Sequence, residues 1–308
     1  MHGESTLSYY AHGKLLLSGE YLVLSGAKAL AIPLKFGQSL KVYSHQKNYF
    51  KWVATHINGH WFEVEFDDNL NIILTDNLEL AKKLSLILQK CINYRDDIKT
   101  IISNSLAVTK LEFNPNWGWG SSSTLISLLS QWLGINPYLL LGETFGGSGY
   151  DIACATANSA IIYQLVDNVP KISPVDFNPP FKENIWLIYS GNKQSSKHEI
   201  KRFSKLRVRD ASIEQINYLT DEMLNSKNIK HFGEMMEQHE RIISQIVQLN
   251  AVKDEHFKEF EGYIKTLGAW GGDFMMVISE EPENYIRTYF KDKGLTSIFK
   301  LNDIKANQ

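Results

Sequence analysis

A glycine- and serine-rich segment near the middle of the chain could bind an anion. Asn116-Trp117-Gly118-Trp119-Gly120-Ser121-Ser122-Ser123-Thr124 leads directly into a run whose apolar residues recur at helical spacing up to Leu133. Glycine lets a backbone approach a phosphate group closely, and the first amide groups of a helix point their N–H bonds at an anion. The hydroxyl groups could bind phosphate oxygens or Mg²⁺. A serine N-cap after a turn explains the same residues, and no lysine of a Walker A loop follows.

Three further segments carry residues that could act on a phosphate group. Gly13-Lys14 ends a short apolar stretch, and a lysine there could neutralise phosphate, although a surface lysine is the commoner case. Residues 146–151 form a loop of small residues that ends in Asp151, which could be a general base or a helix N-cap. Residues 268–273 form a glycine-rich turn before an apolar strand. None of the three is specific when taken alone.

The order and spacing of the four segments resemble the GHMP kinase superfamily over nearly the whole chain. Residues 11–21 resemble its first motif, usually Ala-Pro-Gly-Lys followed by Gly-Glu-Tyr or Gly-Glu-His. Residues 118–123 resemble the second, Gly-Leu-Gly-Ser-Ser-Ala, and residues 268–273 the third, Gly-Ala-Gly-Gly-Gly. Residues 148–151 match the loop that carries the catalytic aspartate of the family. Together these matches predict an ATP-dependent small-molecule kinase.

Several details resemble phosphomevalonate kinases more than mevalonate kinases. They lie in residues 147–152, 191–197 and 265–273, the last of which ends in an aspartate. The resemblance therefore implies transfer of the γ-phosphoryl group of ATP to an isoprenoid-pathway acid, phosphomevalonate first, with mevalonate or another GHMP acceptor as the alternative. A hypothesis of another class is a catalytically silent metabolite-binding or interaction module with the same fold.

The resemblance also assigns roles to residues. Asp151 would accept or orient the acceptor proton, and Lys14 beside it would lower its pKa and stabilise the transferred group. Mg²⁺ would be bound by Ser121 or Ser122 and by Glu143. The ATP phosphates would lie over Gly118, Trp119, Gly120, Ser121, Ser122 and Ser123. The acceptor would contact Glu20, Tyr21, Ser148, Gly149, Lys193, Ser195, Ser196 and Lys197. The third glycine motif would contribute Gly268, Ala269, Gly271, Gly272 and Asp273.

The sequence departs from the family pattern at several positions. His12 replaces a proline, and Ser123 and Thr124 replace alanines. Trp119 replaces a leucine of the second motif, and Trp270 replaces a glycine of the third. The two indoles either pack outward on their loops or reshape the nucleotide or substrate pocket, and the sequence leaves both alternatives open.

The implied fold is α+β (mixed α/β) with two domains. An N-terminal ribosomal-protein-S5-domain-2-like domain would cover residues 1–170 and a ferredoxin-like α+β domain residues 171–308, with the active site in the cleft between them. The proline- and asparagine-rich residues 169–180 are the candidate boundary. Apolar patterning and turn signals predict strands at 40–43, 50–54, 61–66, 106–113, 185–189, 274–278 and 297–301, with a hairpin at Asn58-Gly59. They predict helices at 77–91 and 122–133 and within 212–250, two short strands around a turn at 9–24, and further helix and strand at 137–141 and 152–162.

Composition narrows the class of protein. The 308 residues carry a formal net charge of −2, without the basic stripe that a nucleic-acid surface needs. No run of about eighteen apolar residues predicts a membrane span. The N-terminus has no signal-peptide pattern, so we expect a cytoplasmic protein. We also expect a monomer or homodimer that acts on a small acidic substrate. Cys91 and Cys154 are expected to be reduced and buried.

Overall fold

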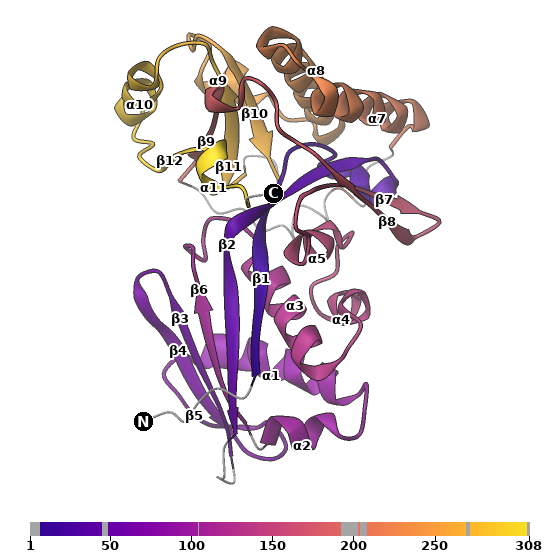
Figure 1. The fold of residues 1–308 in the computed structure, drawn as a ribbon, viewed down its shortest axis with the longest axis vertical. Helices are drawn as coiled ribbons and strands as arrows, with labels where there is room; N and C mark the ends of the chain where they lie inside the picture. The colour runs from indigo at the N-terminus through magenta and orange to yellow at the C-terminus, as the bar shows by residue number, and fades with distance from the viewer. Residues whose placement is uncertain are drawn as a thin grey trace. The chain divides into compact units, whose positions relative to one another are not determined.

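The computed structural model of the chain describes residues 7–44, 49–103, 105–191, 203, 208–268 and 272–306. These residues group into two compact units. Unit 1 comprises Met1–Gly13, Phe36–Pro115 and Trp119–Thr156, and unit 2 comprises Lys14–Lys35, Asn116–Gly118 and Ala157–Gln308. The units interleave along the sequence, and the expected domains, 1–170 and 171–308, stay a prediction. The α+β class expected from the sequence is confirmed (Figure 1).

The larger sheet is built around one long strand. Among the described residues it has eight strands in the order β5-β4-β3-β6-β2-β7-β8, with β1 paired to β2. The 16-residue β2 pairs with β7 at its start, within unit 2, and with β6 along its second half, within unit 1. The strands are β1 (Leu7–Leu16), β2 (Ala29–Ser44), β3 (Phe50–His56), β4 (Gly59–Phe66), β5 (Ile72–Thr75), β6 (Ser105–Leu111), β7 (Ala160–Val166) and β8 (Val169–Val175).

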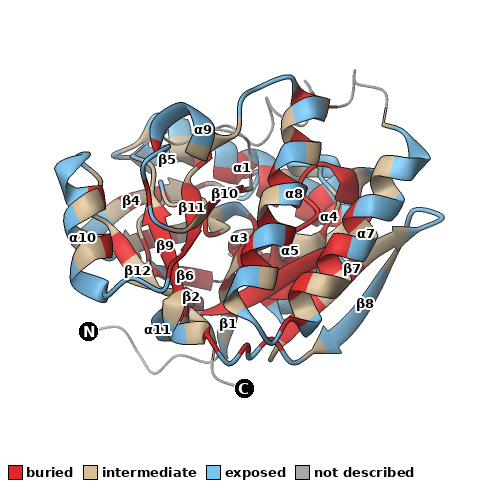
Figure 2. Ribbon diagram, turned by 90° about the horizontal axis from the view of Figure 1, so that it is seen from above, coloured by how far each residue is buried: buried red, intermediate tan, exposed pale blue. Residues whose placement is uncertain are grey.

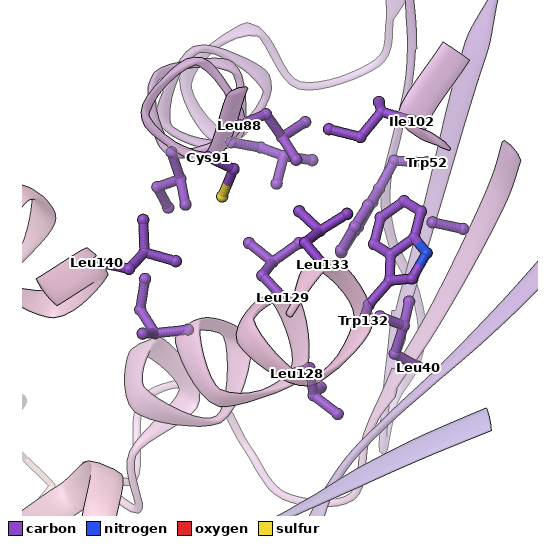
Figure 3. Close-up of a cluster of buried hydrophobic side chains, with 14 of the residues drawn as sticks. Leu40, Trp52, Leu88, Cys91, Ile102, Leu128, Leu129, Trp132, Leu133 and Leu140 are labelled. Carbon is purple, nitrogen blue, oxygen red and sulfur yellow. The ribbon is translucent and has the colours of Figure 1, made fainter. Parts of the chain in front are cut away.

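Unit 1 packs its helices against one face of its strands, as Figure 1 shows. These helices are α1 (Leu78–Ile92), α2 (Ile98–Ser103), α3 (Ser121–Leu133), α4 (Pro137–Thr144) and α5 (Tyr150–Ala155). β3 buries every second residue, starting with Phe50 and Trp52, because alternate side chains of a strand point to the same face. Figure 3 shows Leu88 of α1 and Leu129 of α3 in the core that these elements enclose, with Trp52 beside them.

Both cysteines are free and buried, as expected from the sequence. Burial raises the pKa of the Cys91 thiol to about 12, because a thiolate is poorly solvated in an apolar core. Cys91 packs in the core of unit 1, where Figure 3 places it beside the leucines of α1 and α3. It is a structural side chain and not a nucleophile.

Unit 2 contains a four-stranded antiparallel sheet in the order β10-β11-β9-β12. These strands are β9 (Ile185–Tyr189), β10 (Tyr263–Leu267), β11 (Phe274–Ile278) and β12 (Ile298–Lys300). Its helices are η1 (Leu22–Ser25), η2 (Lys182–Asn184), α7 (Asp210–Asn225), α8 (Ile229–Val247), α9 (Val252–His256), α10 (Glu283–Asp292) and α11 (Leu301–Ile304). Figure 2 shows α7 and α8 with buried residues on one side and exposed residues on the other. This amphipathic pattern is typical of helices that pack on a sheet.

Three regions differ from the expectation. Residues 169–175 form β8 rather than a linker, and Pro170 and Pro174 fit there because, among the described strands, β8 ends the sheet and pairs with β7 alone. Residues 150–155 form the helix α5, and the second strand expected within 9–24 is the short helix η1. The patterning at 212–250 divides into two helices at Asn228, whose side chain accepts a hydrogen bond from the Lys230 amide (2.8 Å).

Among the described residues, no helix combines the length and the apolar character that crossing a membrane requires.

Candidate functional site

The start of α3 is suited to bind an anion. Gly120 occupies its N-cap position with φ 93° and has no side chain that could accept a hydrogen bond from the first turn. The amide groups of that turn therefore depend on another acceptor, and a phosphate would fill this role. Ser122 is exposed and Ser121 is half-buried. The buried Ser123 donates its hydroxyl hydrogen bond to the Gly120 carbonyl (2.9 Å), so it supports the turn instead of facing a ligand.

Trp119 packs inward, into unit 1. Its side chain is only 1% exposed, and its ring lies against Phe36 (6.2 Å between centroids) and Phe113 (5.8 Å). The buried indole therefore anchors the glycine loop, and Trp119 could contact a phosphate only through its backbone. Neither alternative left open by the sequence describes this arrangement, because a tryptophan on a polar loop gives no local indication that it packs between Phe113 and the distant Phe36.

Gly13 of the first motif packs directly beneath this loop. A β-carbon at position 13 would lie 3.1 Å from the Trp119 carbonyl oxygen and 2.9 Å from that of Phe36. The first and second motifs therefore meet within unit 1 at a point where only glycine fits. Lys14 follows Gly13 in the chain and is a half-buried residue of β1, assigned to unit 2.

Gly118 brings the second motif against the third, within unit 2. Its φ is +66°, and a β-carbon there would lie 1.8 Å from Oδ2 of Asp273. The Asp273 carbonyl accepts a hydrogen bond from the Ser190 amide (2.9 Å), and the Ser190 hydroxyl donates to the Gly272 carbonyl (2.6 Å). The end of β9 thus fixes the end of the third motif. Burial and the Asp273 charge raise the pKa of the neighbouring Tyr189.

Asp151 lies in the first turn of α5, after Gly149 at the N-cap with φ 87°. Its Oδ1 accepts a hydrogen bond from the Ile152 amide (3.1 Å), and the side chain is half-buried. The pKa of Tyr138, on α4, is raised by burial and secondarily by the Asp151 charge. Ser148, also half-buried, precedes Gly149 in the same loop. The Asp151 carboxylate is therefore held at the start of a helix in unit 1.

Glu143 is already engaged on the surface of unit 1. Its carboxylate accepts a hydrogen bond from the Tyr94 hydroxyl (3.0 Å) and lies 3.7 Å from the Lys90 ammonium. Burial and the Glu143 charge raise the pKa of Tyr94 to about 12. A metal ion would have to displace these partners. In the described part of the chain, no group of three or more His, Cys, Asp or Glu side chains is arranged to hold a metal ion.

Glu20 and Tyr21, which were expected to contact the acceptor, are both buried in unit 2, and their role at the acceptor stays a prediction. Glu20 is 3% and Tyr21 8% exposed. Glu20 pairs with Lys265 of β10, and the Tyr21 ring lies against Phe203 (5.2 Å). The sequence pattern could not indicate this, because the partner of Glu20 lies 245 positions along the chain.

The buried titratable residues around Glu20 were missed as functional candidates. They are Lys265, which pairs with Glu20, and His239 and Glu240, and all three are buried in unit 2. A signal for two of them exists in the sequence. His239 and Glu240 fall on the spacing of the buried apolar residues of α8, whereas Lys265 is recognised only from its burial within β10. A titratable side chain at a core position needs a partner, and this need identifies the cluster.

Unit 2 also contains a cavity of about 480 Å³. Met275, Phe257 and Leu295 supply apolar walls, Lys293 and His256 are cationic or titratable, and Gly272 of the third motif borders it. Lys293 is partly engaged, because its ammonium lies 5.1 Å from the centroid of the Tyr289 ring.

Several expected site residues lie outside the described residues. They are Lys193, Ser195, Ser196 and Lys197 of the predicted acceptor loop, and Ala269, Trp270 and Gly271 of the third motif. Gly268, with φ +75°, precedes the second group, and Gly272 follows it.

No protein-family model matches the sequence, and no curated protein matches it. The structure does match solved structures. Mevalonate kinase from Methanococcus jannaschii aligns with a TM-score of 0.71 and 17% identity over 99% of both chains. Phosphomevalonate kinase from Streptococcus pneumoniae, in complex with phosphomevalonate and AMPPNP, aligns with a TM-score of 0.70 and 15% identity over 96% of this chain and 100% of the other.

Galactokinase from Lactococcus lactis, complexed with galactose, aligns with a TM-score of 0.66 and 13% identity over 95% of this chain and 92% of the other. All three similar proteins are GHMP kinases. The chain therefore has the GHMP kinase fold over nearly its whole length, as the four motifs predicted.

Proposed function

We propose that the chain is an ATP-dependent phosphotransferase of the GHMP class that phosphorylates a small acidic metabolite. The observation that carries this proposal is the start of α3, where a glycine without a capping side chain precedes the helix in a fold shared with known kinases. An uncapped helix start of this kind binds a phosphate through amide hydrogens and the helix dipole.

The donor set fits Mg²⁺-ATP. The first-turn amides of α3 would bind phosphate oxygens, and the hydroxyls of the half-buried Ser121 and the exposed Ser122 would approach a phosphate or a metal ion. Mg²⁺-ATP would supply the phosphoryl group and neutralise its charge. The Asp273 carboxylate beside Gly118 disfavours a bare phosphate at that glycine, so a cation there is expected. Asp273 is therefore a second candidate metal ligand, in addition to Glu143.

Asp151 and Lys14 would carry the chemistry. Asp151 would accept or orient the proton of the attacking hydroxyl group, and Lys14 would stabilise the charge that develops on the transferred phosphoryl group. Phosphoryl transfer needs alignment and charge neutralisation more than covalent catalysis, so a carboxylate and an ammonium suffice.

For the acceptor we propose phosphomevalonate, with mevalonate as the alternative. The support is the likeness of residues 147–152 and 265–273 to phosphomevalonate kinases, and a solved phosphomevalonate kinase is among the structures that this chain resembles. The predicted acceptor loop carries Lys193 and Lys197, whose ammonium groups would suit an anionic acceptor.

The test is turnover of Mg²⁺-ATP with phosphomevalonate, mevalonate and homoserine by the wild type and by Asp151→Asn. We expect the variant to lose about a hundred- to ten-thousand-fold in turnover while retaining its affinity for Mg²⁺-AMPPNP. Asp68→Asn, at an exposed turn of the same unit, is the matched control and should keep full turnover. Undiminished turnover in Asp151→Asn would remove this carboxylate from the mechanism.

The same assay separates the enzyme from a silent binding module. Binding of Mg²⁺-AMPPNP at a hundredfold its Kd should stabilise the fold by about 2.7 kcal/mol. Stabilisation without turnover of any of a broad panel of small acids would favour the binding module. Absence of both would overturn the proposed function.

A further inference from the structure

Lys265 is a buried ammonium group in the middle of unit 2. Its side chain is 1% exposed, and its Nζ donates to Oε1 of Glu20 and to the Thr266 carbonyl (2.8 Å). Glu20 belongs to the first motif and Lys265 lies three positions before Gly268, where the third motif begins. One buried ion pair therefore joins two motifs that are far apart in the sequence.

Helix α8 contributes two consecutive buried side chains beside this pair, one for each motif. Nε2 of His239 accepts a hydrogen bond from the Gly19 amide (2.9 Å), in the first motif. The Glu240 carboxylate accepts from the Thr266 hydroxyl (2.9 Å) and from the Thr266 amide (3.2 Å), next to the third motif. We call Glu20, His239, Glu240 and Lys265 the buried polar cluster.

The protonation of His239 follows from this geometry. Because Nε2 accepts from Gly19, the ring proton lies on Nδ1, and burial together with nearby Lys265 lowers the pKa of His239 well below its ordinary value. His239 is therefore neutral. Its Nε2 lies 3.4 Å from Oε2 of Glu20, but neither atom has a proton to donate to the other. In the described part of the chain, Nδ1 of His239 and Oε2 of Glu20 have no hydrogen-bond partner.

The buried polar cluster is a poor way to stabilise a core. A buried ion pair gains little over apolar residues of similar volume, and each unsatisfied buried polar atom is destabilising. Burial also raises the pKa of Glu20, although Lys265 and the Gly268 amide oppose this rise. The cluster does fix the geometry of two segments, because each of its hydrogen bonds to the chain holds a backbone or hydroxyl group in or next to one motif.

We propose that the buried polar cluster is a positioning element that holds the turn at Gly19 and the turn at Gly268 in a fixed relation, and that Glu20 acts through Lys265 instead of touching the substrate. Its consequence for nucleotide affinity rests on the proposed function, whereas the coupling between the two turns does not.

Hydrogen–deuterium exchange tests the coupling directly. In Glu20→Gln, we expect peptides that cover residues 264–268 to exchange about tenfold faster, and in Lys265→Met we expect the same of peptides that cover 18–28. Peptides from β3 and β4 should not change. Glu79→Gln, which breaks an exposed ion pair with Lys83, is the control and should alter neither segment. Faster exchange confined to the mutated segment would overturn the proposal.

Two additions keep the test decisive if Lys265→Met does not fold. Glu240→Ala removes the acceptor of the Thr266 hydrogen bonds, and coupling of the two turns predicts faster exchange at 18–28 as well as at 264–268. Mg²⁺-AMPPNP affinity is then measured for Glu20→Gln, with an expected loss of about tenfold and an unchanged KM for the acceptor. A raised acceptor KM with unchanged nucleotide affinity would instead make Glu20 a substrate contact. Coupled exchange in a chain that binds no nucleotide would retain the positioning element and reject the proposed function.

Discussion

Gly118 illustrates how a single residue can decide whether two motifs fit together. The place of its missing side chain is taken by the Asp273 carboxylate, and its backbone has a positive φ that other residues rarely adopt. Next to it, Trp117 packs against Phe274 and Phe299 of unit 2, so the residue before the glycine is also anchored there.

We predict that Gly118→Ala destabilises the protein by about 1–3 kcal/mol, because the methyl group collides with Asp273 and the φ is strained. Urea denaturation measures this change. Asp273→Ala in the same chain should recover part of the loss by removing the collision. Gly142→Ala is the control, since its β-carbon meets no atom within 4 Å in α4, and alanine there should stabilise slightly. Equal losses at positions 118 and 142 would contradict the packing argument.

Leu88 and Leu86 of α1 offer a second contrast between neighbouring residues. Leu88 is completely buried, whereas Leu86 is 63% exposed. We predict that Leu88→Ala lowers the free energy of unfolding by about 2–5 kcal/mol through the cavity it leaves, and that Leu86→Ala changes it by less than about 0.5 kcal/mol. Chemical denaturation of the two variants checks this, and similar losses would show that the core is not where Figure 3 places it.

At the scale of elements, α8 combines an apolar face with two titratable side chains on that same face. Burial raises the pKa of Glu240 to about 7, with Lys265 and the hydrogen bonds of Thr266 opposing the rise. The folded protein therefore binds a proton on Glu240 between about pH 4.5 and 7, whereas the unfolded chain does not.

We predict from this difference that Glu240 contributes stability at pH 5 that is lost as the pH rises to 7, with no further loss from this group above pH 7, while the lowered pKa of His239 contributes with the opposite sign. Glu240→Gln cannot titrate and should remove this component of the slope. Urea denaturation of both proteins at pH 5, 6, 7 and 8 gives the comparison. Parallel stability curves for the two proteins would show that Glu240 is not protonated in the fold.

The elements with strong periodicity were predictable from the sequence. β9, β11, α3 and the hairpin at Asn58-Gly59 appear within a residue or two of their expected positions, because turn residues and alternation determine them locally. β10 and α10 were missed. β10 contains Lys265, and a lysine interrupts an apolar pattern unless its buried partner is known.

The candidate site was predictable only in part, for the same reason. Glycines that must pack closely could be found as motifs, whereas the contacts that explain them, such as Gly118 with Asp273 and Gly13 with Trp119, link residues distant in the chain. Glu20 was assigned to the acceptor because a motif gives the type of residue but not its burial. The roles of Asp151 and Lys14 stay predictions.

At the scale of the whole molecule, β8 at the end of the larger sheet combines exposed apolar residues with two prolines. β8 carries the exposed apolar residues Val169 (64%) and Ile172 (42%), which would favour association with another chain. Pro170 and Pro174 lie opposite Leu165 and Ile161 of β7 in the register.

A strand arriving from a second molecule would find no amide hydrogen at either proline, so the ladder cannot be continued outward at these two positions. We predict that replacing both with threonine increases light scattering several-fold in concentrated solution, while Ser173→Thr, which keeps both prolines, does not. If the double variant stays monodisperse, a feature other than the two prolines must prevent association at β8. If the prediction holds, the two proline rings prevent fibril-like growth at β8 despite its exposed apolar residues.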